Sequence, residues 1–441
     1  MGLFIRAAAF GFLFALLGGA AASAETLKEM GRRTDQEAIA WSGTFNEPHL
    51  AAFVRESLAR NDEPALLVAN VTAAATHSQR AVSLLLPILR QTSGGARTSY
   101  LAASGNPLAG TEAPALGIFF AVGWEKEMWK TFSERRDFPD ADYGAFRWSL
   151  AAQSLKAWTL AVEARMEQKL AERAVDASKQ ILQTVQAQLE GRAALRGDFD
   201  RATADLAESR QNAADADLAA RAAVRGLETL LGRYPEDLLE KVRFFQASPP
   251  ALPAGLPSSL LERRPDVRQA GEALVAAFPD QVGSARLPLL PLTSVTGGPS
   301  ETLDRLFDEG NPFSFSGSLL DALRKGGYSD AEFDKLDGRQ QEAVTRYDAA
   351  ARAAFREVQR MLDNEISLRA REESLLRIVT NDETVRKVAE KRYQNGSIDL
   401  TDLRAAEMQE IQTGAALIAV HASRLSNRAD LTLALGGAVP R

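Results

Sequence analysis

Histidine, the residue best suited to proton transfer and metal binding near neutral pH, occurs three times in this chain of 441 residues. His49, His77 and His421 lie far apart, and none has a second ligand at a spacing that metal sites use. The sequence also has no phosphate loop ending in Lys-Ser or Lys-Thr, and no Gly-x-Ser-x-Gly turn. We therefore expect neither an enzyme nor a protein that binds a cofactor.

Acidic residues recur in a pattern. Asp198 and Asp402 each precede a long Ala-rich stretch, and they are 204 residues apart. Three other landmarks recur in order at almost that offset: a proline closing an apolar run (Pro87 and Pro291), a glycine pair (94–95 and 297–298) and an apolar stop containing glycine (230–233 and 434–437). Four ordered landmarks predict an internal two-fold sequence repeat.

The first residues are typical of a secretory signal peptide at 1–24. They carry Arg6, an apolar run at 7–17 and an Ala-x-Ala motif that ends at Ala24. An uncleaved anchor helix is the alternative. The rest is predicted to comprise a first repeat at 25–246, a proline-rich connector at 247–257 and a second repeat at 258–441.

Composition limits the partners and the sources of stability. The formal net charge is −6, which argues against nucleic acid because phosphate binding needs a basic surface. The chain has no cysteine, so an exported form would have no disulfide bonds. Stability must come from packing.

Proline placement predicts long helices. None occurs between Pro139 and Pro235 or between Pro312 and Pro440, and proline inside a helix costs about 3 kcal/mol. Each window contains one turn with glycine, at 191–197 and at 395–396. We therefore expect two long helical hairpins. In the second, an apolar stripe at helical spacing predicts a buried, coiled-coil-like face: Tyr347, Ala351, Phe355, Val358, Leu362 and Ile366.

Short apolar segments predict strands. A membrane β-strand needs only about 9–11 residues, and residues 113–122 are nearly all apolar while residues 312–320 alternate Phe and Ser. Helical stretches at 47–81 and 258–277 lead to apolar runs at 84–87 and 287–292. The expected order in each copy is helix, strand, strand, long helical hairpin. After the first segment no run of 18 apolar residues occurs.

Several segments resemble one protein family. Residues 255–270 (GLPSSLLERRPDVRQA) are similar to the segment that opens the second repeat in TolC-like outer-membrane efflux proteins, of the branch that works with resistance-nodulation-division pumps. Further similar segments are 285–297 (ARLPLLPLTSVTG), 124–129 (WEKEMW), 354–358 (AFREV) and 393–396 (YQNG). The resemblance covers nearly all of the mature chain.

The resemblance implies an α+β membrane protein that works as a homotrimer. Each protomer would contribute four strands to one 12-stranded β-barrel in outer-membrane lipid. The long α-helical hairpins would form a periplasmic tunnel. The implied partners are a periplasmic adaptor protein and an inner-membrane pump.

The resemblance also implies a tunnel gate at the second hairpin tip. Asp402 lies nine residues after Tyr393, where the family places an acidic ring that attracts cations. Asp399 would share this role. Arg404 and Arg392 would pair with acidic residues across the protomer interface. The alternative is that Asp402 is a helix N-terminal charge and that the arginines are exposed helix charges.

Both hairpin tips are expected to contact the adaptor. The second tip contains Asn395 and Gly396, where a sharp turn needs the positive φ that glycine adopts without strain. The first contains Gly191, Gly197 and Asp198. We interpret Asp198 as a helix cap or a solvated charge.

Two further groups have a structural and a functional interpretation. In the motif at 263–266 (RRPD), we expect Pro265 to begin a helix and Asp266 to lie in its first turn. Trp124 and Trp129 could lie in an aromatic belt at the membrane interface or could pack below it.

The predicted function is a passive exit duct in the bacterial outer membrane, with a large periplasmic part. Two other classes are alternatives: a periplasmic adaptor with one hairpin, and a soluble coiled-coil binding module. The 204-residue repeat disfavours the first, and the predicted strands disfavour the second.

Overall fold

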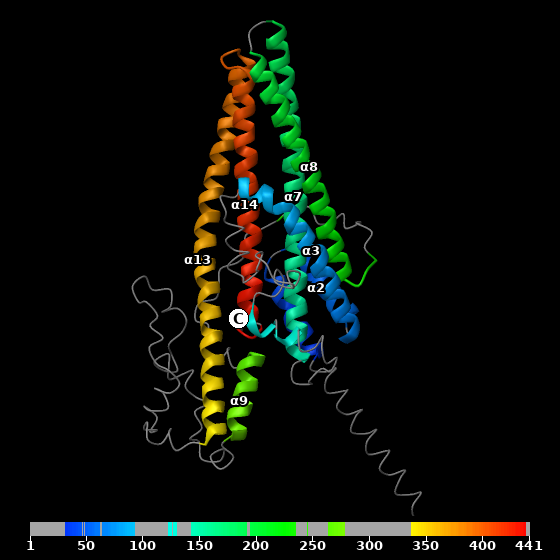
Figure 1. The fold of residues 1–441 in the computed structure, drawn as a ribbon, viewed down its shortest axis with the longest axis vertical. Helices are drawn as coiled ribbons and strands as arrows, with labels where there is room; N and C mark the ends of the chain where they lie inside the picture. Colours follow the sequence, from blue (N-terminus) through cyan, green and yellow to red (C-terminus); the bar gives the residue numbers. More distant parts are fainter. Residues whose placement is uncertain are drawn as a thin grey trace, which may run out of the picture.

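The computed structural model describes residues 31–45, 47, 49–61, 64–92, 122–125, 127–129, 143–191, 195–234, 245, 263–277 and 337–437. The regular elements in these ranges are helices (Figure 1). Residues 31–43 are helical. The helices that follow are α2 (Leu50–Arg60), α3 (Pro64–Thr92), α7 (Tyr143–Glu190), α8 (Arg196–Leu230), α9 (Pro265–Ala277), α13 (Gly338–Gln394) and α14 (Leu400–Ala434).

The two predicted helical hairpins are confirmed. The first consists of α7 and α8, with 48 and 35 residues, and the second of α13 and α14, with 57 and 35 residues. At 1.5 Å per residue, α13 is about 85 Å long, far longer than a helix of an ordinary globular domain. Helices α8 and α14 have equal length and begin at residues 196 and 400, the offset of the predicted repeat.

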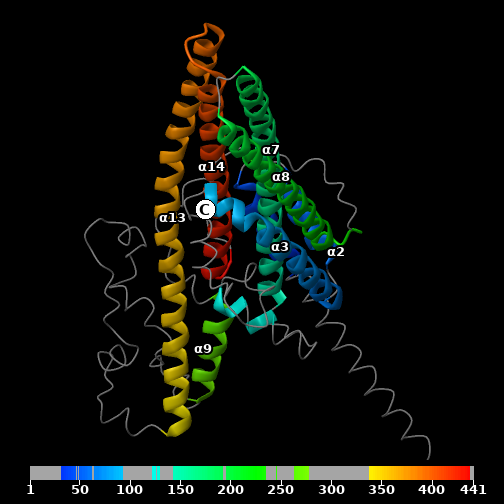
Figure 2. The ribbon, with the colours of Figure 1, turned by 45° about the horizontal axis from the view of Figure 1, so that its top comes forward.

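The four long helices form an elongated layer in the order α8, α7, α14, α13 (Figures 1 and 2). Both hairpin tips lie at one end, which we call the tip end, and the opposite end is the base. Helix α3 packs on α8, α2 packs on α7, and α9 packs on α13 near the base. Helices α8 and α13 form the two edges of the layer.

Small residues allow α3 and α8 to approach closely. Ala219, Ala220 and Ala223 of α8 are buried, and a Cβ added to Gly226 would lie 2.7 Å from the Ser78 hydroxyl and 3.2 Å from the Ala74 carbonyl. The Ala-rich composition of this stretch therefore serves tight helix packing as well as helix propensity.

Three helices end in the same way. Gly232, Gly396 and Gly436 follow α8, α13 and α14 with φ of 66°, 69° and 81°. At each end the glycine N–H bonds the carbonyl three residues back, and the next N–H bonds the carbonyl five residues back. This is a Schellman motif, which needs the left-handed conformation that glycine favours. The prediction for Gly396 is thus confirmed, and the two apolar stops also end helices.

The structure corrects several boundaries. The apolar run at 84–87, expected to lead into a strand, lies inside α3. Gly197 belongs to the first turn of α8, so the first hairpin turn ends at Leu195. The helix expected at 258–277 begins at Pro265, and the one expected at 47–81 is divided between α2 and α3. The predicted strands at 113–122 and 312–320 and the signal peptide lie outside the described residues, except for Val122.

The apolar stripe of α13 is confirmed except at one end. Tyr347, Phe355, Val358 and Leu362 are buried, whereas Ile366 is 53% exposed. Glu365 takes the buried position instead, because arginines of α14 neutralise its carboxylate.

Candidate functional site

The second hairpin tip is built around Asp399. Its backbone is extended, and its Oδ1 accepts a hydrogen bond of 2.9 Å from the N–H of Asp402. Asp399 is therefore the N-cap of α14, with Asn395 and Gly396 ending α13 on the other side of the turn. Asp402 lies in the first turn of α14 with an exposed side chain. A carboxylate there is favoured by the helix dipole and remains free to face solvent or a neighbouring chain.

The first tip uses its acidic residue differently. Asp198 Oδ2 accepts a hydrogen bond of 3.0 Å from the N–H of Leu195, so its carboxylate caps α8. Leu195 is 75% exposed at this tip, and Gly191 and Gly197 have exposed positions beside it. Asp198 and Asp402 thus occupy corresponding helix positions, but only Asp198 uses its side chain as a cap in the contacts seen here.

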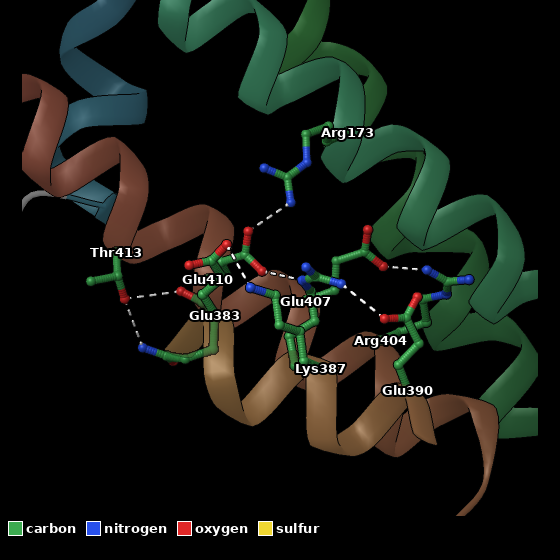
Figure 3. A network of polar contacts seen from close by, with 10 residues as sticks. Arg173, Glu383, Lys387, Glu390, Arg404, Glu407, Glu410 and Thr413 are labelled. Atoms are coloured by element: carbon green, nitrogen blue, oxygen red, sulfur yellow. Dashed lines mark hydrogen bonds and ion pairs between the residues drawn. The ribbon is translucent and has the colours of Figure 1, made fainter. Parts of the chain in front are cut away.

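Below the tips, Arg404 bonds within its own chain. Its guanidinium contacts Glu407 of α14 (Figure 3). It also contacts the Gln180 amide oxygen of α7. Arg404 was expected to pair with acidic residues across the protomer interface. In the structure it has partners within its own protomer. Arg392 is exposed near the end of α13.

Glu410 connects three helices. Its Oε1 bonds Arg173 of α7 at 3.1 Å, and its Oε2 contacts Arg386 of α13 (Figure 3). Close by, the Thr413 hydroxyl donates to Asp382 across α13 and α14 at 2.7 Å. Two sets of contacts thus link the two hairpins: Glu410 with Arg173 and Arg386, and Arg404 with Gln180. Sequence reasoning missed all of these except Arg404, because their partners lie on other helices, far away along the chain.

The base is held by the arginine of the 263–266 motif. Arg264 is fully buried; it bonds both oxygens of Asp266, Glu357 Oε2 of α13 at 2.9 Å, and the Ala434 carbonyl of α14 at 3.1 Å. Pro265 begins α9 and Asp266 lies in its first turn, as expected. These contacts support the structural interpretation of the 263–266 motif, in which it begins a helix and holds it in place.

The tryptophans pack against helices. Trp124 and Trp129 are each 5% exposed. The Trp124 indole donates to the Leu433 carbonyl at 3.1 Å, and the Trp129 indole donates to the Ser149 hydroxyl at 2.8 Å. Trp129 also meets Phe146 edge-on, with ring centroids 5.3 Å apart. The packing alternative is confirmed over the membrane-interface alternative.

Within the described ranges, no group of three or more histidine, cysteine, aspartate or glutamate residues could hold a metal ion. Nor does any helix described here have the length and apolar character needed to cross a membrane. The polar side chains at the tips instead act as helix caps, and those below the tips form contacts that link the hairpins.

Two parallel hairpins in one long layer, charged at their tips, define a helical protein of the kind that forms rods or tunnel walls. A family model described as outer membrane efflux protein matches residues 256–437, nearly the whole second predicted repeat. OpmQ, the pyoverdine export outer membrane protein of Pseudomonas aeruginosa, is 25% identical over 424 residues, covering 92% of this chain and 89% of that protein. Over residues 256–437 the chain thus matches the outer membrane efflux protein family, and its likeness to OpmQ extends over 92% of its length.

Other relatives match over less of their length or more distantly. The cation efflux system protein CusC of Escherichia coli is 29% identical over 255 residues, covering 55% of this chain and 52% of that protein. A solved structure of CusC has a TM-score of 0.63 at 20% identity and covers 90% of this chain and 98% of that one. The solved structure of the outer-membrane channel OprN has a TM-score of 0.54 at 21% identity, and the match covers 91% of this chain and 93% of that one. These structures support the fold.

Proposed function

We propose that this chain is the outer-membrane exit duct of a tripartite efflux system and conducts substrates passively from a periplasm-spanning assembly to the exterior. It works as a homotrimer, receives substrates through a periplasmic adaptor and an inner-membrane pump, and has no energy source of its own. The signal peptide at 1–24 and the repeats at 25–246 and 258–441 belong to this proposal. The periplasmic adaptor and the soluble coiled-coil module remain the alternative classes.

The observation that carries the proposal is the open layer of helices. Helix α8 forms one edge and α13 the other, so the α13 edge of one copy can pack on the α8 edge of the next. The α13 surface has exposed apolar side chains at Ile378, Val385 and Val388, and α8 has one at Leu218. Such a head-to-tail contact repeats until the ring closes, and a closed ring of long helices encloses a tunnel.

The predicted strands fit the same assembly. Four strands from one chain leave two unpaired edges, which lipid does not tolerate because exposed backbone groups there have no hydrogen-bond partners. Three chains would supply the twelve strands of one closed barrel. The residues that would form these strands include 113–122 and 312–320.

The cargo is proposed to depend on the pump. OpmQ carries the name of a pyoverdine exporter, CusC that of a cation efflux protein, and TtgI of Pseudomonas putida that of a toluene efflux protein. Chemically unrelated cargoes among relatives are what a duct without a dedicated binding pocket would produce.

Membrane extraction followed by bilayer reconstitution tests the duct. We expect the full-length protein to be recovered from the outer-membrane fraction, to run as a trimer, and to produce discrete conductance steps in a planar bilayer. Recovery in the soluble fraction would favour the coiled-coil module. A membrane-bound form without conductance, even when supplied with adaptor, would favour the adaptor class.

Asp402 is proposed to line the constriction, with Asp399 and Arg404 beside it. In the reconstituted trimer, we expect Asp402→Ala to lower the cation-to-anion permeability ratio by a factor of about two or more, since a unit charge ~8 Å away in water contributes about 0.5 kcal/mol. Asp198→Ala is the matched control at the other tip and should leave the ratio unchanged. Equal ratios in wild type and Asp402→Ala would remove Asp402 from the constriction.

A further inference from the structure

Residues 123–125 and 127–129 form a short junction between the helices at the base, which we call the 123–129 junction. They follow directly on the segment at 113–122, and they contact three long helices. The Gly123 N–H donates to Glu357 of α13 at 2.8 Å, while the two indoles of the junction bond α14 and α7 through Leu433 and Ser149. The junction is thus fastened to both hairpins at once.

Glu125 lies at the centre of this junction and is fully buried. Its Oε1 accepts hydrogen bonds from the Ser149 hydroxyl at 2.5 Å and from the Gln153 amide at 2.6 Å, both on α7. Its Oε2 is buried with no hydrogen-bond partner among the residues the structure describes. A carboxylate oxygen without a partner away from water is costly, and the cost falls when the carboxyl group is neutral.

The charged groups that face Glu125 are an ion pair between two helices. Lys156 of α7 contacts Asp430 of α14, and both side chains are buried. Lys156 favours the ionised form of Glu125 and Asp430 disfavours it, so these two charges oppose each other. Burial is the larger effect, and the pKa of Glu125 is raised to about 7 in spite of Lys156 and the two hydrogen bonds.

We propose that Glu125 is a proton-operated latch that holds the 123–129 junction against α7 and α14 more tightly when its carboxyl group is protonated. The unbonded Oε2 of Glu125 and the neighbouring charge of Asp430 both make the junction weaker when Glu125 is ionised than when it is protonated. The latch goes beyond the proposed duct function, because it concerns how the chain segment at 113–122 is joined to the hairpins. It predicts a junction that loosens as the surroundings change from mildly acidic to alkaline.

The direction of the pH effect follows from linkage. When the junction opens, Glu125 meets water and its pKa returns toward the ordinary value of 4.5. The closed junction therefore binds the proton more tightly than the open one, and closure weakens as pH rises from 4.5 through about 7. Between pH 6 and pH 8 the opening equilibrium should rise about tenfold.

Hydrogen exchange measured by mass spectrometry tests the latch on the full-length protein in detergent. After correction for the intrinsic pH dependence of exchange, amides 123–129 should be protected about tenfold less at pH 8 than at pH 6. In Glu125→Gln, which keeps the shape but cannot ionise, protection should not differ between the two pH values. Equal protection of the wild type at both pH values would overturn the proposal.

Two further variants separate the latch from a general loss of structure. Glu127 is exposed in the same junction, so Glu127→Gln is the matched control and should keep the wild-type pH dependence. Ser149→Ala removes one donor to the Glu125 carboxylate and should move the midpoint upward by about one pH unit. A pH dependence retained in Glu125→Gln, or a midpoint unmoved in Ser149→Ala, would assign the effect to another group.

Discussion

Replacing Arg264 with methionine is expected to destabilise the protein by about 3 kcal/mol, because it removes one partner from a buried ionic cluster. Asp266 and Glu357 would be left side by side without a cation, and the Ala434 carbonyl would lose its donor. We place the effect at the lower end of the usual range because both carboxylates are partly exposed, 27% for Asp266 and 18% for Glu357, and can regain water.

The thermal midpoint of helix loss, followed by circular dichroism, measures this effect under identical detergent conditions. Arg264→Lys keeps the charge but loses the bidentate contact, so it should fall between wild type and Arg264→Met. Arg263→Met changes the exposed neighbour and should shift stability by no more than about 0.5 kcal/mol. Equal midpoints for Arg263→Met and Arg264→Met would contradict the role given to the buried cluster.

Arg264 matters beyond stability because of what it joins. It fixes the start of α9 to α13 and to the last residue of α14, and Glu357 in turn receives the Gly123 N–H of the base junction. A Cβ added to Gly436 would lie 2.9–3.0 Å from atoms of residues 263 and 264, so the end of α14 already fits closely against this motif. The base is therefore one connected unit, whereas the tips are joined by partly exposed ion pairs.

The hairpins could be predicted because their signals are local. Proline absence marked the helical windows, and Gly396 marked the turn through the φ that a Schellman motif requires. The prediction that the apolar run at 84–87 leads into a strand was wrong, because four apolar residues fit a strand or a helix equally well. Val82 and Leu85 are buried three residues apart, which is the spacing of a helix face.

Partners on different helices could not be predicted in the same way. The contact of Arg404 with Gln180 depends on how far α7 and α14 are shifted along each other, and no local pattern records that shift. Glu125 gave no signal either, because an acidic residue beside Trp124 is ordinary until α7 closes over it. The stripe predicted that Ile366 is buried, but Glu365 is buried instead. Its carboxylate bonds Arg424 and Arg428, which lie 59 and 63 residues further along the chain.

Those arginines belong to a buried cluster between α13 and α14. Glu372 bonds His421 Nδ1 at 2.5 Å and Arg424 Nη1 at 2.5 Å, and Glu365 bonds Arg424 Nε at 2.8 Å and Arg428 Nη2 at 2.9 Å. Burial alone would raise the pKa of Glu372, but the hydrogen bonds and charges of His421 and Arg424 lower it to about 2. The cluster therefore stabilises the hairpin only while Glu372 is ionised.

Stability of the second hairpin should consequently fall in acid. The pKa of Glu372 is about 2 when folded and 4.5 in the ordinary state, so its contribution is complete above pH 4.5 and is lost as pH falls toward 2. A shift of this size corresponds to about 3 kcal/mol. Hydrogen exchange of α13 between pH 5 and pH 2.5, corrected for intrinsic rates, should show this loss of protection.

Two variants determine whether Glu372 causes the loss. Glu372→Gln should be destabilised at pH 7, and its protection should approach that of the wild type as pH falls toward 2, since protonation increasingly removes the wild-type charge. Glu373→Gln alters the next residue, a 53% exposed partner of Arg369, and should keep the full acid dependence. If Glu372→Gln lost protection in acid as steeply as the wild type, another carboxylate would control the hairpin, and Glu365, which bonds both arginines, would be the group to replace next.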